Sequence, residues 1–319
     1  MSLSSVELCA GGGGQALGVE QAHFEHEVLV EREARFCETL RLNRPKWKVE
    51  AQDLREFADS AGDYRGVDLL AGGLPCPPFS KAGKQLGESD ERNLFPTALE
   101  IIDAVRPAAV MIENVRGLLD AVFADYRQFI EGRLQKLGYV PGWRLLNASD
   151  FGVPQLRPRV VFVALKKSRA EYFSWPEPSG VPAPTVGDTL FPLMASRGWR
   201  GAKKWRALAN EIAPTIVGGS TKHGGPDLGP TRAKRAWASL GVDGMKIGNE
   251  PPPRDFVGMP NLTVEMVALL QGFPPDWRFA GPKTIAYRQV GNAFPPPVAE
   301  KVALAIRAAL QARRSVTVA

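Results

Sequence analysis

A cysteine in a stiff loop is the residue of this chain with the clearest chemical use. Cys76 follows the apolar run at 67–71 and stands within GLPCPPFS, residues 73–80. An apolar run closed by glycine and proline predicts a buried strand that leads into a loop. Open α/β sheets bind their ligands at the carboxyl ends of such strands. A lone thiol is more often a buried structural residue, but the neighbouring prolines fix the backbone that presents this sulfur. We therefore interpret Cys76 as a nucleophile.

A glycine-rich loop near the amino terminus predicts a nucleotide site. The run at 5–9 leads into ELCAGGGG, residues 7–14, and glycines let a ligand approach the backbone closely. Glu31 lies 20 residues beyond Gly11, the separation at which an acid hydrogen-bonds ribose hydroxyls. Asp53 is placed to accept a hydrogen bond from an adenine amino group. The loop also satisfies the dinucleotide fingerprint, so by itself it does not separate a methyltransferase from a nicotinamide enzyme.

These residues need a sheet to position them, and the first half of the chain alternates strand and helix patterns. We expect strands at 5–9, 27–30, 67–71, 108–112, 140–146 and 159–165, and helices at 34–42, 95–105 and 121–137. Strand and helix in alternation predict an α/β fold with a doubly wound, mostly parallel sheet. Prolines between 168 and 185 mark a linker, and residues 186 to about 280 read as irregular.

A helix pattern resumes at 298–312 and is expected to return to the sheet. The expected parts are therefore a catalytic and cofactor-binding domain at 1–167, a smaller irregular domain with its linker at 168–280, and a C-terminal segment at 281–319.

Three further segments narrow the chemistry. MIENV (111–115) places Glu113 at the end of another strand, FGVPQLRPR (151–159) carries two arginines, and QVGNAFPP (289–296) lies near the carboxyl terminus. Together with Pro75-Cys76, these segments resemble the ordered motifs of the DNA (cytosine-5-)-methyltransferase family, of the bacterial restriction–modification type. The resemblance covers nearly the whole chain apart from residues 185 to 255. It implies the S-adenosylmethionine-dependent methyltransferase fold and methyl transfer to carbon 5 of cytosine.

The resemblance gives each catalytic candidate a role. Cys76 would add to carbon 6, which makes carbon 5 reactive and splits one hard step into easier ones. Glu113 would share a proton with ring nitrogen 3, and burial would raise its pKa towards the protonated form. Arg159 would hold the carbonyl oxygen at position 2 together with Glu113. Arg157 would support the loop, and Asn114 would fix the turn that aims Glu113.

The resemblance also implies which residues hold the methyl donor, S-adenosylmethionine. Glycines of the loop would contact it, Glu31 would bind its ribose and Asp53 its adenine. The full set is Cys9, Gly11, Gly13, Gly14, Glu31, Arg32, Asp53, Leu54, Pro75, Leu94 and Asn292. The chain departs from the family pattern at Cys9, which replaces an aromatic residue that packs on adenine. It departs again at Pro77, where Gln is common, and at Arg32, which replaces an apolar or aromatic residue.

The target base lies inside the duplex, so it must be rotated out before reaction. The family's loop after the nucleophile closes on DNA, and the expected contacts there are Ser80, Lys81, Lys84 and Gln85. Residues 196–235 carry nine basic and two acidic side chains, which is a net charge of +7. The whole chain has a net charge of +6, so the remaining residues sum to about −1. A basic block of this kind is typical of a phosphate-binding surface. We expect 185 to 255 to be the target recognition region, with DNA contacts at Thr215, Arg232, Lys234 and Arg235.

Composition sets outer limits on the function. Three cysteines make neither a disulfide framework nor a metal cage, and no apolar run approaches the length of a membrane span. We expect a cytoplasmic monomer without metal that acts on double-stranded DNA, with a cognate restriction endonuclease acting separately on the same site. RNA (tRNA) methylation by the same fold remains an alternative. A catalytically silent DNA-binding protein would explain the basic block but has no need for the thiol.

Overall fold

A mixed sheet forms the centre of the protein in the computed structural model, which describes residues 2–75, 93–218 and 226–312. In the described residues the strand order is β3-β2-β1-β4-β5-β7-β6. The bounds are β1 Leu3–Leu8, β2 Phe24–Val30, β3 Val49–Glu50, β4 Leu69–Gly73, β5 Ala109–Val115, β6 Tyr139–Asn147 and β7 Pro158–Lys166. Strands β1 to β5 pair in parallel, whereas β7 runs antiparallel between β5 and β6. This confirms the predicted doubly wound, mostly parallel sheet.

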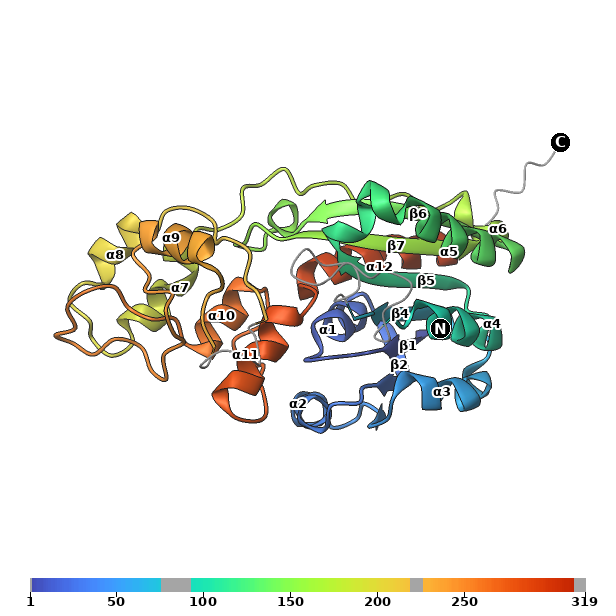
Figure 1. Cartoon of the computed structure of the whole chain (residues 1–319), viewed down its shortest axis with the longest axis horizontal. Helices are drawn as coiled ribbons and strands as arrows, with labels where there is room; N and C mark the ends of the chain where they lie inside the picture. Colours follow the sequence, from blue (N-terminus) through green and yellow to red (C-terminus); the bar gives the residue numbers. More distant parts are fainter. Residues whose placement is uncertain (1, 76–92, 219–225, 313–319) are drawn as a thin grey trace.

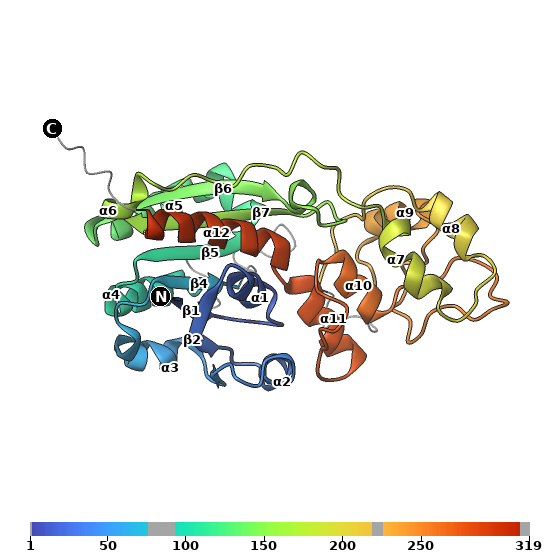
Figure 2. The same cartoon turned by 180° about the vertical axis from the view of Figure 1, so that it is seen from behind.

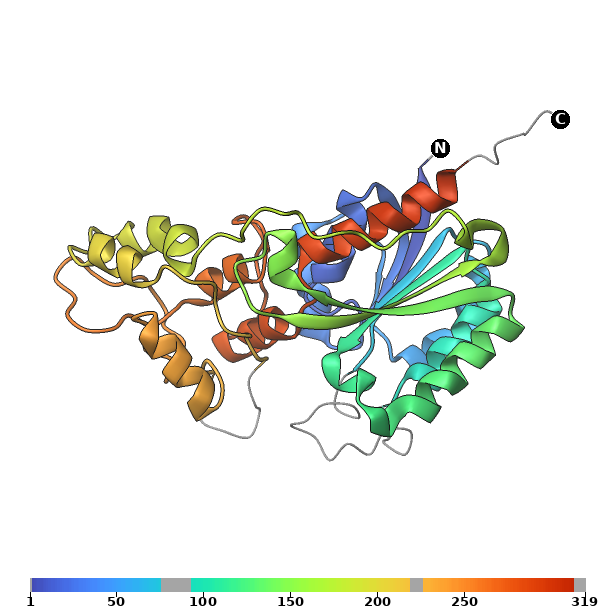
Figure 3. The same cartoon turned by 90° about the horizontal axis from the view of Figure 1, so that it is seen from above.

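Helices cover both faces of the sheet. On one face lie α3 (Leu54–Ser60), α4 (Phe95–Val105) and α5 (Ala124–Lys136), and on the other lie α1 (Gly14–Gln21) and α12 (Pro296–Gln311) (Figure 3). Helix α2 (Ala34–Asn43) packs beside α1 through Leu40, and α6 (Lys167–Ala170) follows β7. Successive residues of a strand face opposite sides, so Val6 and Leu8 join the α4 side while Ser5 and Glu7 face α1.

The carboxyl-terminal helix explains how the end of the chain reaches the beginning. In α12, the apolar residues Val298, Val302, Ile306 and Leu310 recur every four positions and are buried, which gives one apolar stripe. Figures 2 and 3 show this helix lying across the sheet beside α1. Gly18 makes the close approach possible, because a Cβ there would lie 2.4 Å from the Pro296 carbonyl oxygen.

A Gly18→Ala variant is therefore expected to be strongly destabilised. The added methyl group meets backbone that cannot turn away, so we expect the free energy of unfolding to fall by about 3 kcal/mol. The matched control is Gly132→Ala in α5, where a Cβ would meet nothing within 4 Å. That variant should gain roughly 0.5–1 kcal/mol, because alanine favours a helix interior. Urea unfolding of both variants checks the contrast, and equal stabilities would contradict it.

The segment predicted to be irregular contains short helices joined by long loops. These are α7 (Val186–Ala195), α8 (Ala202–Leu208), α9 (Thr231–Ser239) and α10 (Val264–Leu270). They pack around the buried tryptophans Trp199, Trp205 and Trp237, away from the sheet at the left of Figure 1. The sequence pattern did not predict these helices. Each helix is short and contributes only a few residues to a core shared with several other segments, so none shows a long periodic apolar stripe.

The final part of the chain is divided between two cores. Helix α11 (Lys283–Asn292) contributes Tyr287 and Val290 to the tryptophan-rich core, whereas α12 packs on the sheet. The division at residues 167 and 280 remains a prediction.

Candidate functional site

The strands that carry the predicted cofactor residues and Glu113 end at one edge of the sheet. Strands β1, β2, β4 and β5 run parallel, so their carboxyl ends face the same way (Figure 3). Gly73, the last residue of β4, is paired in register with Glu113 of β5. The strand that leads to Cys76 therefore ends beside Glu113. Cys76 itself lies outside the described residues, as do Ser80, Lys81, Lys84 and Gln85.

Glu113 forms a buried ion pair with Arg159. The Arg159 Nε lies 2.7 Å from Oε1 of Glu113, and the side chains are 13% and 5% exposed, respectively. Strand β5 continues to Val115, three residues past the predicted end at 112, so Glu113 is held inside a strand. Burial raises the pKa of Glu113 above its usual value, while Arg159 and then Arg157 act to lower it. The arrangement suits a carboxyl group that holds or shares a proton more readily than an exposed glutamate does.

Asn114 connects the ends of β4 and β5. Its Nδ2 donates to the carbonyl oxygen of Leu74 at 3.3 Å, and its Oδ1 accepts from the backbone N–H of Val115 at 2.9 Å. The amide therefore fixes the backbone two residues before Cys76 as well as the turn after Glu113. This position fits the predicted structural role.

Arg157 is fully buried and points into the junction between loops. Its guanidinium donates to the carbonyl oxygens of Ile216, Gly291 and Ala293, at 2.6, 2.8 and 3.0 Å. It affects Glu113 through charge, and its Nη1 also donates to Oε1 of Gln155 at 3.3 Å. The geometry is that of a residue that positions neighbouring loops.

The glycine loop is shaped both by its backbone angles and by packing. Gly11 and Gly13 have φ of 57° and 87°, values that favour glycine. A Cβ on Gly11 would meet only the Cys9 carbonyl oxygen, at 3.9 Å, so this position is open to a ligand. Gly13 and Gly14 are packed instead, since added Cβ atoms would lie 2.7 Å from Trp277 and 2.3 Å from the Phe294 carbonyl oxygen.

Glu31 and Asp53 lie at the carboxyl ends of β2 and β3. Glu31 is buried, and its two oxygens accept from the backbone N–H groups of Gly11 and Glu33, both at 2.8 Å. Burial raises its pKa, and these two hydrogen bonds oppose the shift. Each carboxylate oxygen retains a further lone pair for a ligand hydroxyl. Asp53 accepts from Arg55 N at 3.0 Å, and its Oδ2 lies 3.7 Å from Arg32.

The apolar members of the predicted cofactor set surround the same edge. Leu54 and Leu94 are buried, Pro75 is partly buried, and Cys9 has a positive φ of 52°. Burial, and then the nearby Glu31, raise the pKa of Cys9 well above its usual range. Asn292 is exposed at the end of α11, against Gly218.

The described DNA-contact candidates differ in how free their polar groups are. Lys234 is bound by Asp227, with Nζ 2.7 Å from Oδ2, whereas Arg232 and Arg235 of α9 are exposed. The hydroxyl of Thr215 donates to the carbonyl oxygen of Leu156, so a phosphate contact would require it to change partner. The arginines therefore remain the better candidates for contact with DNA.

Three buried glutamines lie near these segments and were assigned no role in the sequence-based prediction. Gln155, Gln271 and Gln289 are each at most 1% exposed. Gln155 and Gln271 belong to the network around Arg157. Their only signal in the sequence is a polar residue set beside glycine or proline, which is common in surface loops as well.

Glu7 is a buried carboxyl group within β1. It is 0% exposed, and among the described residues neither of its oxygens has a hydrogen-bond partner. Burial alone raises its pKa well above its value of 4.5 in an unfolded chain. The folded protein therefore retains a proton that the unfolded chain releases. As a result, stability decreases as pH rises from about 4.5 towards the pKa of the folded state.

A Glu7→Gln variant should remove this pH dependence. The variant is expected to be more stable than the parent at pH 8. The difference should shrink as pH falls towards 4.5, because Glu7 of the unfolded parent then begins to take up the proton that the folded parent already holds. Urea unfolding at several pH values between 5 and 8 measures it. A difference that stays constant across this range would show that Glu7 does not titrate as its burial implies.

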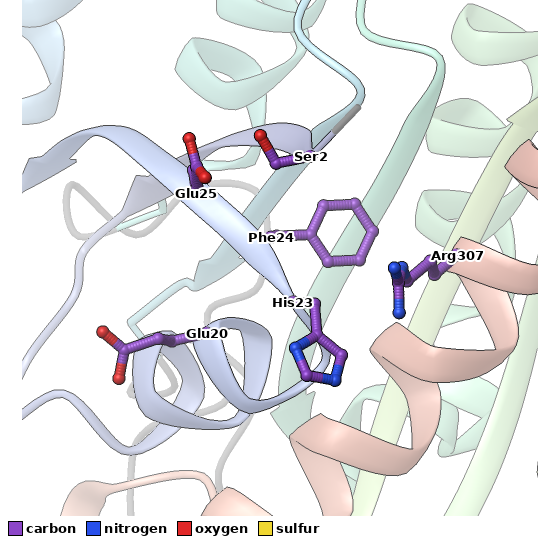
Figure 4. A pocket seen from close by; sticks show the side chains of 6 residues that line it. All are labelled: Ser2, Glu20, His23, Phe24, Glu25 and Arg307. Atoms are coloured by element: carbon purple, nitrogen blue, oxygen red, sulfur yellow. The ribbon is translucent and has the colours of Figure 1, made fainter.

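A separate pocket lies at the opposite end of the strands. It has a volume of ≈ 510 Å³ and is bordered by the start of β2, the end of α1 and α12. Figure 4 shows the lining side chains Ser2, Glu20, His23, Phe24, Glu25 and Arg307. None of them belongs to the predicted site. In the described part of the chain, no cluster of His, Cys, Asp and Glu is arranged to hold a metal ion, and no helix is long and apolar enough to span a membrane.

Comparison with known families and proteins gives a consistent result. The family model described as C-5 cytosine-specific DNA methylase matches residues 3–308. The chain is 58% identical over 313 residues to the type II methyltransferase M.NaeI of Lentzea aerocolonigenes, covering 97% of this chain and 76% of that protein. It is 52% identical over 314 residues to the type II methyltransferase M.NgoMIV of Neisseria gonorrhoeae, covering 98% and 99%.

Solved structures of the same fold are more distant in sequence. The Entamoeba histolytica methyltransferase EhMeth superposes with a TM-score of 0.69 at 14% identity, covering 98% of this chain and 100% of that one. The Dnmt2 methyltransferase of S. pombe gives a TM-score of 0.64 at 17% identity, covering 97% and 100%. At these identities the likeness supports the fold.

Proposed function

The chain belongs to the C-5 cytosine-specific DNA methylase family, and from this premise we propose that it methylates a cytosine rotated out of double-stranded DNA, with S-adenosylmethionine as methyl donor. It is a DNA (cytosine-5-)-methyltransferase of the type II restriction–modification kind. The observation that carries the mechanistic part is the buried Glu113–Arg159 ion pair, beside the strand that leads to Cys76. A carboxyl group at that place whose pKa is raised by burial favours catalysis over DNA binding alone.

The residues at the carboxyl edge fit the methyl donor. The space where a Gly11 side chain would be is open to a ligand. Glu31 keeps lone pairs free for the two ribose hydroxyls. Asp53 would accept from the adenine amino group, and Leu54 and Leu94 would line the apolar wall. S-adenosylmethionine supplies an electron-poor methyl group when it is bound. The chain's own task is to make carbon 5 of cytosine nucleophilic enough to accept it.

Three side chains would share that task. Attack of the Cys76 thiolate on carbon 6 forms a carbon–sulfur bond and moves the ring electrons towards carbon 5 and nitrogen 3. Glu113, whose pKa is raised by burial, would provide a proton at nitrogen 3 and so stabilise this charge. Arg159 would hold the oxygen at position 2 while keeping Glu113 in place. After methylation, loss of the carbon 5 proton returns the electrons, and the carbon–sulfur bond breaks.

The smaller domain, predicted at 168–280, would recognise the target DNA sequence. Arg232 and Arg235 are exposed on α9, where a guanidinium can reach phosphates or bind a guanine through two hydrogen bonds. Ser80, Lys81, Lys84 and Gln85 would close on the DNA backbone. We propose that the protein works as a monomer, and that a cognate endonuclease cleaves the same site when it is unmethylated.

Two experiments test this function. Sequencing of cytosine methylation in DNA from cells that express the chain should reveal carbon 5 methylation at one short motif. Duplex DNA with 5-fluorocytosine at that target should then form a covalent adduct with the protein in the presence of S-adenosylmethionine, because fluorine cannot leave as a proton does. Methylation of tRNA alone would favour the RNA alternative. Reversible binding without adduct, by protein that methylates normal DNA, would reject the covalent mechanism.

A further inference from the structure

We propose that Arg157, Gln155 and Gln271 form a positioning junction that holds the recognition segment 213–218 in register with the Glu113–Arg159 pair. This inference rests on the proposed function and extends it to residues that touch neither base nor methyl donor. The junction would align the extruded cytosine with the catalytic groups after DNA has bound. It is called the Arg157 junction below.

The recognition segment is joined directly to the loop that carries Arg159. Ala213 N donates to the Pro154 carbonyl oxygen at 2.9 Å, and Leu156 N donates to the Ala213 carbonyl oxygen at 2.7 Å. These bonds make a parallel bridge between Gln155 and Ala213. One strand of this pairing leads to Arg159 in four residues, and the other leads to Ile216 in three. A shift in one segment must therefore move the other.

Gln155 extends this pairing with its side chain. Its Oε1 accepts from Ile216 N at 2.9 Å and from Arg157 Nη1 at 3.3 Å. Its Nε2 donates to Gln271 Oε1 at 2.6 Å and to the Leu270 carbonyl oxygen at 3.1 Å. Both ends of the amide are engaged, so its orientation is fixed.

Arg157 closes the network from the other side. Its donors reach the carbonyl oxygens of Ile216, Gly291 and Ala293, and Gln271 Nε2 also donates to the Ala293 oxygen, at 2.6 Å. The planar fork of arginine can address several carbonyls at once, which an ammonium group cannot do in the same geometry. The junction therefore ties the recognition segment to the turn between α11 and α12.

Glycine contacts carry this connection to the cofactor loop. A Cβ on Gly291 would lie 2.6 Å from the Cα of Gly218 and 2.7 Å from the Val217 carbonyl oxygen, so these backbones touch. On the other side, Gly14 packs on the Phe294 carbonyl oxygen. The α11–α12 turn thus lies between the cofactor loop and the recognition segment, and Arg157 binds its carbonyls. Buried polar networks of this kind are known to specify one arrangement of segments.

Replacement of Arg157 by lysine tests the junction while keeping the positive charge. For the folded Arg157→Lys variant we expect kcat to fall about 100-fold, with KM and Kd for the target duplex changed less than threefold, because binding precedes alignment. Fluorescence of 2-aminopurine at the target position should still rise on binding, since the base is still extruded. Adduct formation with 5-fluorocytosine DNA should slow in parallel with kcat.

Two controls separate this role from others. Arg65→Lys changes an exposed arginine that also donates to a carbonyl oxygen, that of Ala104, and should keep the parent kcat. Gly291→Ala, which pushes backbone against backbone, should reproduce the kcat defect of Arg157→Lys more strongly than Gly218→Ala. A Cβ on Gly218 would meet the end of the Asn292 side chain, which can move away.

The outcomes are distinct. If folded Arg157→Lys protein has the same kcat as the parent, the junction proposal is overturned. It is also overturned if only the affinity for DNA falls, because Arg157 would then be a direct DNA contact. A kcat defect that disappears after correction for the folded fraction would leave only a structural role and also overturns it. If the parent protein itself neither methylates DNA nor forms the adduct, the proposed function fails instead.

Discussion

Replacing Cys76 by alanine is expected to abolish methyl transfer, with a loss of more than about 10⁴-fold, because the substitution removes the proposed nucleophile of the covalent mechanism. Binding to the target duplex should persist, since the proposed mechanism uses the thiol for reaction and assigns the contacts with phosphates and bases to other residues. The measurement is incorporation of labelled methyl groups into target DNA, together with the Kd for that DNA. No adduct with 5-fluorocytosine DNA should form.

The other two cysteines provide the control. Burial, and after it the charge of Glu31, raises the pKa of Cys37 to about 11, and its thiol donates to the Glu31 carbonyl oxygen. The pKa of Cys9 is raised still more, again mainly by burial. Neither thiol ionises near neutral pH, so neither is a competent nucleophile. A Cys37→Ser variant should therefore keep both methylation and adduct formation. Turnover near the parent rate in Cys76→Ala protein would refute the assignment of the nucleophile.

A Glu113→Gln variant is expected to lose about 10³-fold in kcat, within the range found for general acids. Glutamine keeps the size of the side chain and its place beside Gly73, but it has no proton to share with nitrogen 3 of the ring. Because the proposed interaction would form only during reaction, kcat and kcat/KM should fall together while the Kd for DNA stays close to that of the parent. Single-turnover methylation measures the effect. A kcat within tenfold of the parent would remove Glu113 from the mechanism.

The pH profile gives an independent check on Glu113. Deprotonation of this group should produce an alkaline decline in kcat/KM for the parent enzyme. Arg159 lowers the pKa of Glu113, so Arg159→Gln should move that decline to higher pH, although the activity itself is reduced. In Glu113→Gln protein the decline should be absent. An unchanged profile in all three proteins would assign it to another group.

The sequence predicted the sheet and its catalytic edge because both depend on short-range patterns. Alternating apolar runs and helix patterns predicted the doubly wound, mostly parallel sheet that the structure confirms, and Glu113, expected at the end of one such run, lies beside the end of the strand that leads to Cys76. Strand β3 was not among the predicted strands, because it has only two residues and too little pattern to recognise.

Contacts between distant segments were beyond the sequence pattern. Nothing local marks Gln155 and Gln271 as partners, because their hydrogen bond joins residues 116 positions apart. The same is true of the packing of Gly14 against Phe294, while the contact of Gly14 with the methyl donor stays a prediction. Glycine's lack of a side chain serves close packing as well as ligand approach, and only coordinates distinguish the two uses.

The seating of α12 against α1 has a consequence for biosynthesis. The surface that Gly18 packs on is made by Pro296 and Ala299, which lie 278 and 281 positions further along the chain and are translated correspondingly later. Pairing of such distant segments is a slow, late event in folding. A nascent polypeptide that has not yet formed α12 therefore lacks the partner on which α1 and the end of the glycine loop are packed.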